Sequence, residues 1–274
     1  MRRWWPTVVA VGLVVAGCGG EPVAEHTPVL DPIVTVGIPP SASASSSPPP
    51  VATTTSTPPP VVIVLNPGHN GGNGGHPDEI ARQVPAGAGK TKECDTTGTQ
   101  TNAGYPEHAF TWDVTLRVRD ALAIRGVTVV MTRENDTGVG PCVDERAAIA
   151  NRSDAAAVVS IHADGSEAAG AHGFHVAYPL PALNEAQGEP SLRLATVLRD
   201  GLGKAGFAPA NYIGQNGLDG RGDLAGLNLS EKPSVFVECG NMRDAADAGV
   251  LGSEDGKQRY AVAIATALMT YIGR

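Results

Sequence analysis

The chain has 274 residues, of which 42% are hydrophobic and 4% aromatic, so it can bury one sizeable core but not two large ones. Its formal charge of −8 argues against nucleic acid or anionic lipid as binding partners. The four cysteines form no CxxC pair, which excludes a cysteine-rich structural zinc site and a thioredoxin-type redox site.

The N-terminal residues have the features of an export signal. Two arginines at positions 2 and 3 precede an apolar run, residues 8–16, that is too short to span a bilayer. The run ends in Val-Ala-Gly-Cys at residues 15–18, which resembles the lipobox of bacterial lipoproteins, where the cysteine is acylated. We expect residues 1–18 to be a signal segment and Cys18 to anchor the exported protein at the outer face of the cytoplasmic membrane. Ordinary signal-peptidase cleavage, giving a secreted or periplasmic protein, is the alternative.

Two further regions differ sharply in composition. Residues 19–60 consist largely of Pro, Ser, Thr and Ala, which offer little to bury, so we expect a disordered tether. From residue 61 to residue 274, short β-branched runs alternate with amphipathic stretches. This pattern predicts a single layered α/β domain with a central twisted, mostly parallel sheet flanked by helices on both faces. We expect this domain to be a monomer.

The elements of this domain can be placed in chain order. The predicted strands cover residues 61–65, 127–131, 155–161, 173–178 and 234–237, and the predicted helices cover residues 106–124, 144–151, 191–204 and 257–272. The first strand is a continuous apolar run, which indicates that both of its faces are covered. Residues 70–105 are rich in Gly, Thr and Asn without a sustained period, so they form a long insertion that can include a hairpin.

Three ionisable residues follow the carboxyl ends of predicted strands. These are His69, His162 and Glu238. Because ligands of open α/β sheets bind at this edge, we expect the three side chains to lie together. Glu107 lies in the first turn of the predicted helix 106–124, on the inward side of this helix. Two imidazoles and one carboxylate with an open position for water form a catalytic zinc shell, and His76 in the insertion is the alternative ligand.

Several short motifs carry a resemblance to a known family. They are NPGHNG at 66–71, PEH at 106–108, TREND at 132–136, ERAAIAN at 145–151, SIHAD at 160–164 and VECGN at 237–241. In this order and spacing, the chain from residue 61 onward resembles the zinc-dependent N-acetylmuramoyl-L-alanine amidases of the Amidase_3 type.

The resemblance implies a function and a role for each site residue. His69, Glu107 and His162 would bind Zn²⁺, and Glu238 would be the catalytic acid and base. The implied reaction is hydrolysis of the amide bond between N-acetylmuramic acid and L-alanine in peptidoglycan or its fragments. Two alternatives stay open: a catalytically silent peptidoglycan-binding lipoprotein, and a different zinc peptidase that acts on stem peptides. The chain lacks the HExxH motif of many zinc peptidases.

The chain departs from the family pattern at three positions beside these motifs. It has Asn66 where Asp is common, Asp164 where Asn is common, and Asn241 where an aromatic residue is common. We expect the amide oxygen of Asn66 to brace His69 by accepting a hydrogen bond, more weakly than a carboxylate would. The departures leave the rate and the substrate preference open.

The cysteines of the domain have separate expected roles. Cys94 lies in the insertion and Cys142 in the loop after the second strand, so in an exported protein we expect a disulfide that pins the insertion beside the cleft. Cys239 directly follows Glu238, and strand alternation turns its side chain away from the metal. We therefore expect a buried free thiol.

Three arginines lie near the motifs. We expect Arg133 and Arg146 to clamp loops through charge-assisted hydrogen bonds, and neither to contact the substrate. Arg221 lies in a predicted loop, where it faces either an anionic stem peptide or solvent.

Overall fold

The computed structural model describes residues 60–274, and the predicted signal segment, the Cys18 anchor and most of the predicted tether lie outside these residues. The main sheet has six strands in the order β4-β1-β5-β8-β6-β7. Their bounds are β1 Val62–Pro67, β4 Thr128–Met131, β5 Ala155–Asp164, β6 His175–Pro179, β7 Leu218–Arg221 and β8 Ser234–Asn241.

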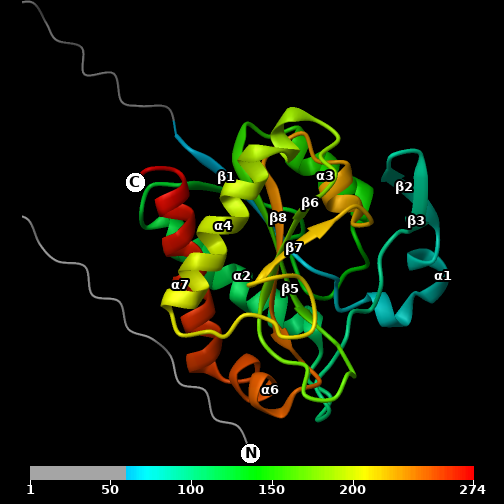
Figure 1. Cartoon of the computed structure of the whole chain (residues 1–274). Helices are drawn as coiled ribbons and strands as arrows, with labels where there is room; N and C mark the ends of the chain where they lie inside the picture. Colours follow the sequence, from blue (N-terminus) through cyan, green and yellow to red (C-terminus); the bar gives the residue numbers. More distant parts are fainter. Residues whose placement is uncertain (1–59) are drawn as a thin grey trace, which may run out of the picture. The chain divides into compact units, whose positions relative to one another are not determined.

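The direction of the strands is mixed but mostly parallel, as predicted. Strands β4, β1, β5 and β8 are parallel neighbours. Strand β6 pairs antiparallel with β8 and parallel with β7. The carboxyl ends of the four parallel strands therefore meet at one edge of the sheet, while β6 begins at that edge (Figure 1).

Helices cover both faces of the sheet, which confirms the predicted layers. The helices α2 Glu107–Ala123, α4 Glu189–Lys204 and α7 Glu254–Tyr271 pack on one face, and α3 Val143–Asn151 and α5 Ala225–Asn228 on the other. Shorter pieces complete the domain, namely η1 Asn73–Gly75, α1 Pro77–Ile80, η2 Glu185–Gln187 and α6 Ala245–Leu251. Within residues 60–274, no helix is long and apolar enough to cross a membrane.

The first strand shows why the sheet is buried on both sides. Ile63 and Leu65 belong to the large core under α2, α4 and α7, whereas Val64 between them belongs to a smaller core with Ala150 of α3. All three strand residues are fully buried. Each such side chain contributes roughly 1.5–3 kcal/mol through removal from water, so the continuous apolar run stabilises both layers.

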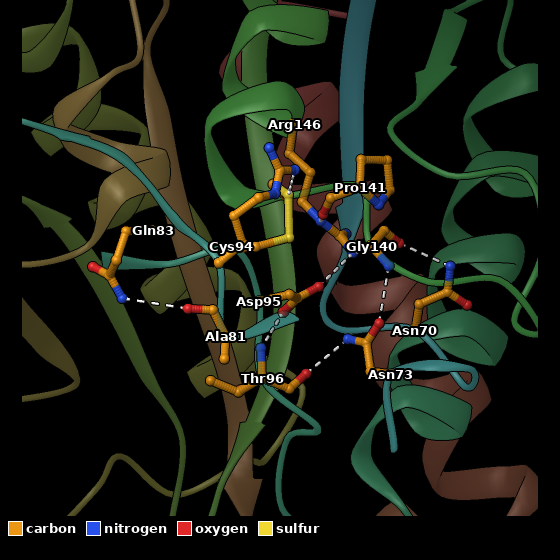
Figure 2. The surroundings of a disulfide bond; sticks show 12 residues. Asn70, Asn73, Ala81, Gln83, Cys94, Asp95, Thr96, Gly140, Pro141 and Arg146 are labelled. Atoms are coloured by element: carbon orange, nitrogen blue, oxygen red, sulfur yellow. Dashed lines mark hydrogen bonds and ion pairs between the residues drawn. A yellow bond between two sulfur atoms is a disulfide. The ribbon is translucent and has the colours of Figure 1, made fainter. Parts of the chain in front are cut away.

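The insertion forms a separate hairpin beside the main sheet. Its strands are β2 Gln83–Gly87 and β3 Lys90–Glu93, which pair antiparallel. The disulfide between Cys94 and Cys142 joins the end of the hairpin to the start of α3, as predicted (Figure 2). On its other side, the side-chain amide of Asn228 in α5 donates a hydrogen bond of 3.1 Å to the Ala86 carbonyl. The hairpin is therefore attached at two points.

Some predicted boundaries were wrong. Strands β5 and β8 continue to Asp164 and Asn241, so His162 and Glu238 lie inside strands and not after them. The prediction ended each strand at the last apolar residue, but backbone pairing does not require an apolar side chain. Arg221 lies in β7, which was predicted to be a loop because its residues are Gly-rich and polar. The short helices α5 and α6 were also not predicted.

Candidate active site

Three of the predicted site residues meet at the carboxyl edge of the parallel strands. The ligand atoms of His69, Glu107 and His162 lie within 4.8 Å of one another. The Glu107 carboxylate bridges the two imidazoles, with Oε2 at 3.2 Å from Nε2 of His69 and Oε1 at 3.0 Å from Nδ1 of His162. Within residues 60–274 this is the one group of three or more His, Cys, Asp or Glu side chains with metal-binding spacing.

The backbone near the site allows the side chains of His69, Glu107 and His162 to lie this close together. His69 follows β1 in the left-handed region, with φ of 57°, which is uncommon for a residue other than glycine. A Cβ atom on Gly68 would lie 2.2 Å from the His162 ring, and one on Gly98 would lie 2.7 Å from both Glu107 and His69. Side chains at these two positions would therefore displace the group.

Glu107 is held by backbone donors as well as by the imidazoles. It is the first residue of α2 and is 4% exposed, so its negative charge lies at the positive end of the helix. The Thr99 amide donates to Oε2 at 2.9 Å, and the Ala163 amide donates to Oε1 at 3.2 Å. These bonds hold the carboxylate between the two imidazoles.

The residue that braces His69 is Asp95 and not Asn66. The Asp95 carboxylate lies 3.3 Å from Nδ1 of His69, and the Thr96 carbonyl lies 3.1 Å from the same atom. The Asn66 oxygen instead accepts hydrogen bonds from Thr132 and Arg146. The prediction for Asn66 was wrong because it gave Asn66 the role of the Asp that the family commonly has at this position, whereas here the insertion supplies Asp95, 26 positions after His69. The sequence signal that could have identified Asp95 was its position directly after Cys94, the cysteine of the insertion that was predicted to form the disulfide.

Two buried arginines clamp the surrounding loops, as predicted. Arg146 donates to Oδ2 of Asp95 at 3.1 Å and to the carbonyl oxygens of Gly140 and Pro141 (Figure 2). It also donates to the carbonyl oxygens of Pro67 and His69. Arg133 donates to the carbonyl oxygens of Pro67, Gly68, His108 and Asn135. These bonds connect the loop after β1 to the loop after β4. The donors of both guanidinium groups are used by acceptors within the protein.

The charges of the group favour a cation between the three side chains. Burial alone would lower the pKa of His69, but Glu107 and Asp95 outweigh it and raise this pKa to about 10. Burial would raise the pKa of Glu107, but the two imidazoles hold it well below its usual range. Burial lowers the pKa of His162, despite its contact with Glu107. Two imidazoles and one carboxylate in a site that stabilises positive charge fit a catalytic zinc ion.

Glu238 lies next to this group on the same face of the sheet. It is paired in register with His162 of β5 on one side and with His175 of β6 on the other, and directly paired residues share a face. Burial, together with the nearby carboxylates of Glu107 and Asp164, raises the pKa of Glu238 well above its usual range. A carboxyl group with a raised pKa is suited to proton transfer near neutral pH.

Two of the three metal-binding candidates and Glu238 open into one cavity of about 210 Å³. His69, His162 and Glu238 line it, together with the hairpin strand β3 and the start of α5. The Phe236 ring forms part of its wall and stacks on His162 at a centroid distance of 5.1 Å. A cavity several times larger than the roughly 30 Å³ of one water molecule admits part of a substrate.

Other candidates lie outside the group. The side chain of His76 is 57% exposed and lies 3.7 Å from Glu79, so this alternative ligand has no place in the site. Arg221 pairs with Asp219 and Asp223, an ion-pair role that the sequence analysis did not consider. Cys239 is fully buried and free, as predicted.

Sequence reasoning did not assign a role to His175. This residue is 2% exposed, and its Nδ1 atom has no hydrogen-bond partner within the described residues. Its position opposite Glu238 follows from the antiparallel pairing of β6 with β8, which no local pattern indicated.

Known proteins that are similar to this chain in sequence and in fold are amidases. A curated N-acetylmuramoyl-L-alanine amidase of Mycobacterium tuberculosis is 50% identical over 208 residues, which are 76% of this chain and 85% of that protein. The crystal structure of an N-acetylmuramyl-L-alanine amidase from Mycobacterium smegmatis superposes with a TM-score of 0.75 at 52% identity, covering 78% of this chain and 97% of that one. An N-acetylmuramoyl-L-alanine amidase of Nostoc punctiforme gives 0.59 at 26% identity, covering 78% and 98%. Residues 63–270 match the Amidase_3 family, described as N-acetylmuramoyl-L-alanine amidase, and the chain belongs to this family.

Proposed function

We propose that the protein hydrolyses the amide bond between N-acetylmuramic acid and L-alanine in peptidoglycan or its fragments. The observation that carries this proposal is the convergence of His69, Glu107, His162 and Glu238 at one strand edge in a chain of the Amidase_3 family. The complete donor set and the adjacent carboxyl group favour an active hydrolase over a catalytically silent binding protein.

The proposed cofactor is a zinc ion. His69 would bind it through Nε2, Glu107 through its carboxylate and His162 through Nδ1, because these are the atoms that face one another. Asp95 and the Thr96 carbonyl would hold the His69 ring through Nδ1, which keeps Nε2 free for the metal. When bound, zinc supplies Lewis acidity toward the substrate carbonyl and toward water.

Glu238 is the proposed acid and base. Its carboxylate would accept a proton from the attacking water, and the carboxylic acid would then donate this proton to the departing amine of L-alanine. Its position beside His162 supports this role because it places the carboxyl group next to the metal-binding side chains. Burial and the neighbouring carboxylates raise its pKa, which makes it a stronger base once ionised.

A peptidoglycan amidase acts in the cell envelope or outside the cell. We propose that residues 1–18 direct export, that Cys18 carries a lipid anchor, and that residues 19–60 tether the catalytic domain of residues 61–274. The proposed catalytic unit is a monomer, because all four site residues come from one chain.

The proposal is tested by mass spectrometry of muropeptides incubated with the protein. We expect a free lactyl carboxylate on muramic acid and a peptide with a free L-alanine amine. A chelator should abolish both products, and zinc should restore them. Glu238→Gln should lose activity by about 10²- to 10⁴-fold while it still binds zinc. Products that form in the presence of chelator, or full activity in Glu238→Gln, would contradict the mechanism.

A further inference from the structure

His175 occupies the strand position directly beside the proposed acid and base. It is paired in register with Glu238 where β6 runs antiparallel to β8. Side chains of such directly paired residues project from the same face of a sheet, with Cβ atoms about 5 Å apart. On its other side Glu238 is paired with His162, a proposed zinc ligand. Glu238 therefore lies between two histidines on one face, of which His162 belongs to the metal group and His175 does not.

The imidazole of His175 is enclosed by the protein and has an unused polar atom. The residue is 2% exposed, and Nδ1 has no hydrogen-bond partner among residues 60–274. Buried polar atoms nearly always have a partner, because an unpaired one loses its contact with water and gains nothing in return. The unpaired nitrogen of His175 therefore requires an explanation from its surroundings.

The other polar groups around His175 are already bound. The Tyr212 ring meets the His175 ring edge to face at a centroid distance of 6.3 Å, but its hydroxyl donates to Oδ2 of Asp164 at 2.9 Å. Asp219, whose charge also acts on His175, accepts a hydrogen bond from Arg221 at 3.4 Å. These groups satisfy one another and leave the imidazole out.

Glu238 is the neighbour whose polar atoms are free. Among residues 60–274, no hydrogen bond or ion pair joins its carboxyl group to another protein group. Burial and the charges of Asp164 and Glu238 raise the pKa of Tyr212, which places Glu238 in the same cluster as the ring that contacts His175.

The two unused groups are chemically complementary. An imidazole can carry a hydrogen on Nδ1 in its neutral and its charged form, and a carboxyl oxygen can accept a hydrogen bond whether or not the group is ionised. A separation of about 5 Å between Cβ atoms is within the combined reach of the two side chains. Rotation of the Glu238 side chain is therefore enough to join a carboxyl oxygen to Nδ1 of His175.

We propose that His175 is a positioning residue for Glu238. Its Nδ1–H group donates a hydrogen bond to one carboxyl oxygen and keeps the other directed at the attacking water. A glutamate side chain rotates about several bonds, so a fixed contact raises the fraction of time in which it is oriented for proton transfer. The inference rests on the proposed amidase function, in which Glu238 is the acid and base.

The test compares two substitutions of similar shape in the full-length protein. His175→Leu removes every polar atom of the side chain, whereas His175→Asn keeps an amide nitrogen at the place of Nδ1. With a muropeptide substrate, His175→Leu should lower kcat about 10- to 100-fold, as expected for one hydrogen bond to a charged group, and should change KM by less than about twofold. His175→Asn should keep kcat within about threefold of wild type. If His175→Leu does not fold, His175→Gln takes its place, because its amide nitrogen lies nearer the place of Nε2.

A second comparison separates positioning from a structural role. Glu238→Ala removes the carboxyl group on which His175 would act, so adding His175→Leu should change the remaining kcat by less than about twofold. A structural role would lower kcat by the same factor in both backgrounds. A readout that needs no turnover is nitrogen NMR of histidine-labelled protein, in which Glu238→Ala should shift the Nδ1 signal of His175.

Ser234→Ala is the matched control. Ser234 is also 2% exposed with an unpartnered polar atom, Oγ, but it lies at the start of β8, away from the site. Its substitution should leave kcat and KM within about twofold of wild type.

Three results would overturn the inference: an unchanged kcat in His175→Leu, an equal loss in the Glu238→Ala background, or an Nδ1 signal that Glu238→Ala does not shift. A wild-type protein that cleaves no muropeptide would instead contradict the proposed amidase function, so the two failures are distinguishable.

Discussion

Replacing Asp95 by asparagine tests how the insertion supports the proposed metal site. The asparagine side chain would keep the shape of the original one but lose the negative charge that faces Nδ1 of His69 and Nη2 of Arg146. The uncharged side chain would be a weaker hydrogen-bond partner for His69, which reduces the basicity of the proposed ligand atom. Loss of such a supporting carboxylate lowers metal affinity by about 10- to 100-fold, which corresponds to about 1.4–2.8 kcal/mol of binding free energy.

The same substitution should lower stability in a pH-dependent way. Burial would raise the pKa of Asp95, but His69 and Arg146 outweigh it and lower this pKa from 3.8 to about 2. The difference is worth about 2.5 kcal/mol of unfolding free energy. Because the folded pKa is below the unfolded value, this contribution is present above about pH 4 and is lost as the pH falls toward 2. Asp95→Asn should therefore be less stable than wild type at pH 7 and nearly equal to it near pH 2.

Zinc affinity should be measured by competition with a fluorescent chelator, and stability by urea unfolding of the metal-free protein across this pH range. Asp136→Asn is the matched control, because Asp136 lies 2.8 Å from His108 in a similar pair outside the metal group. We expect the control to keep zinc affinity within about threefold of wild type, since it removes no group that touches a proposed ligand side chain. Unchanged zinc affinity in Asp95→Asn would refute the reasoning.

Three further predictions concern the site and its surroundings. Glu238→Gln should lower kcat by about 10²- to 10⁴-fold, which is the usual contribution of a general acid or base. Metal analysis should show an unchanged zinc stoichiometry. Weakened zinc binding would mean that Glu238 acts as a ligand. The double variant Cys94→Ser and Cys142→Ser opens a 48-residue loop. Thermal unfolding should therefore show that the free energy of unfolding falls by up to about 4 kcal/mol. Chelator competition should also show weaker zinc binding, because Asp95 directly follows Cys94 and would be held less firmly beside His69. Since the pKa of metal-free His69 is about 10, zinc has to displace a proton at neutral pH, and affinity should rise about tenfold per pH unit between about pH 7 and 9. Calorimetry in buffers of different ionisation enthalpy should detect this proton, and zinc binding without proton release would contradict the assignment.

The sequence determined the layers of the fold and most of the proposed site. Continuous apolar runs such as Ile63–Leu65 identify strands that are buried on both faces, and the amphipathic stretches between them identify the covering helices. His69 and His162 were placed together by one rule, that parallel strands end at a common edge. The position of Glu107 on the inward side of its helix supported it as a ligand, but its assignment depended more on the resemblance to the Amidase_3 family. These inferences depend on local patterns, which the chain encodes residue by residue.

The tertiary structure decided the features that depend on contacts between distant segments. Asp95 reaches His69 because the hairpin folds back over the strand edge. His175 lies opposite Glu238 because β6 runs antiparallel to β8. Hydrophobic periodicity indicates whether a segment is buried, but it does not indicate which partner covers it or in which direction that partner runs. Pairing order and loop placement depend on the packing of the whole domain, so the supporting groups of the site became visible only in the folded structure.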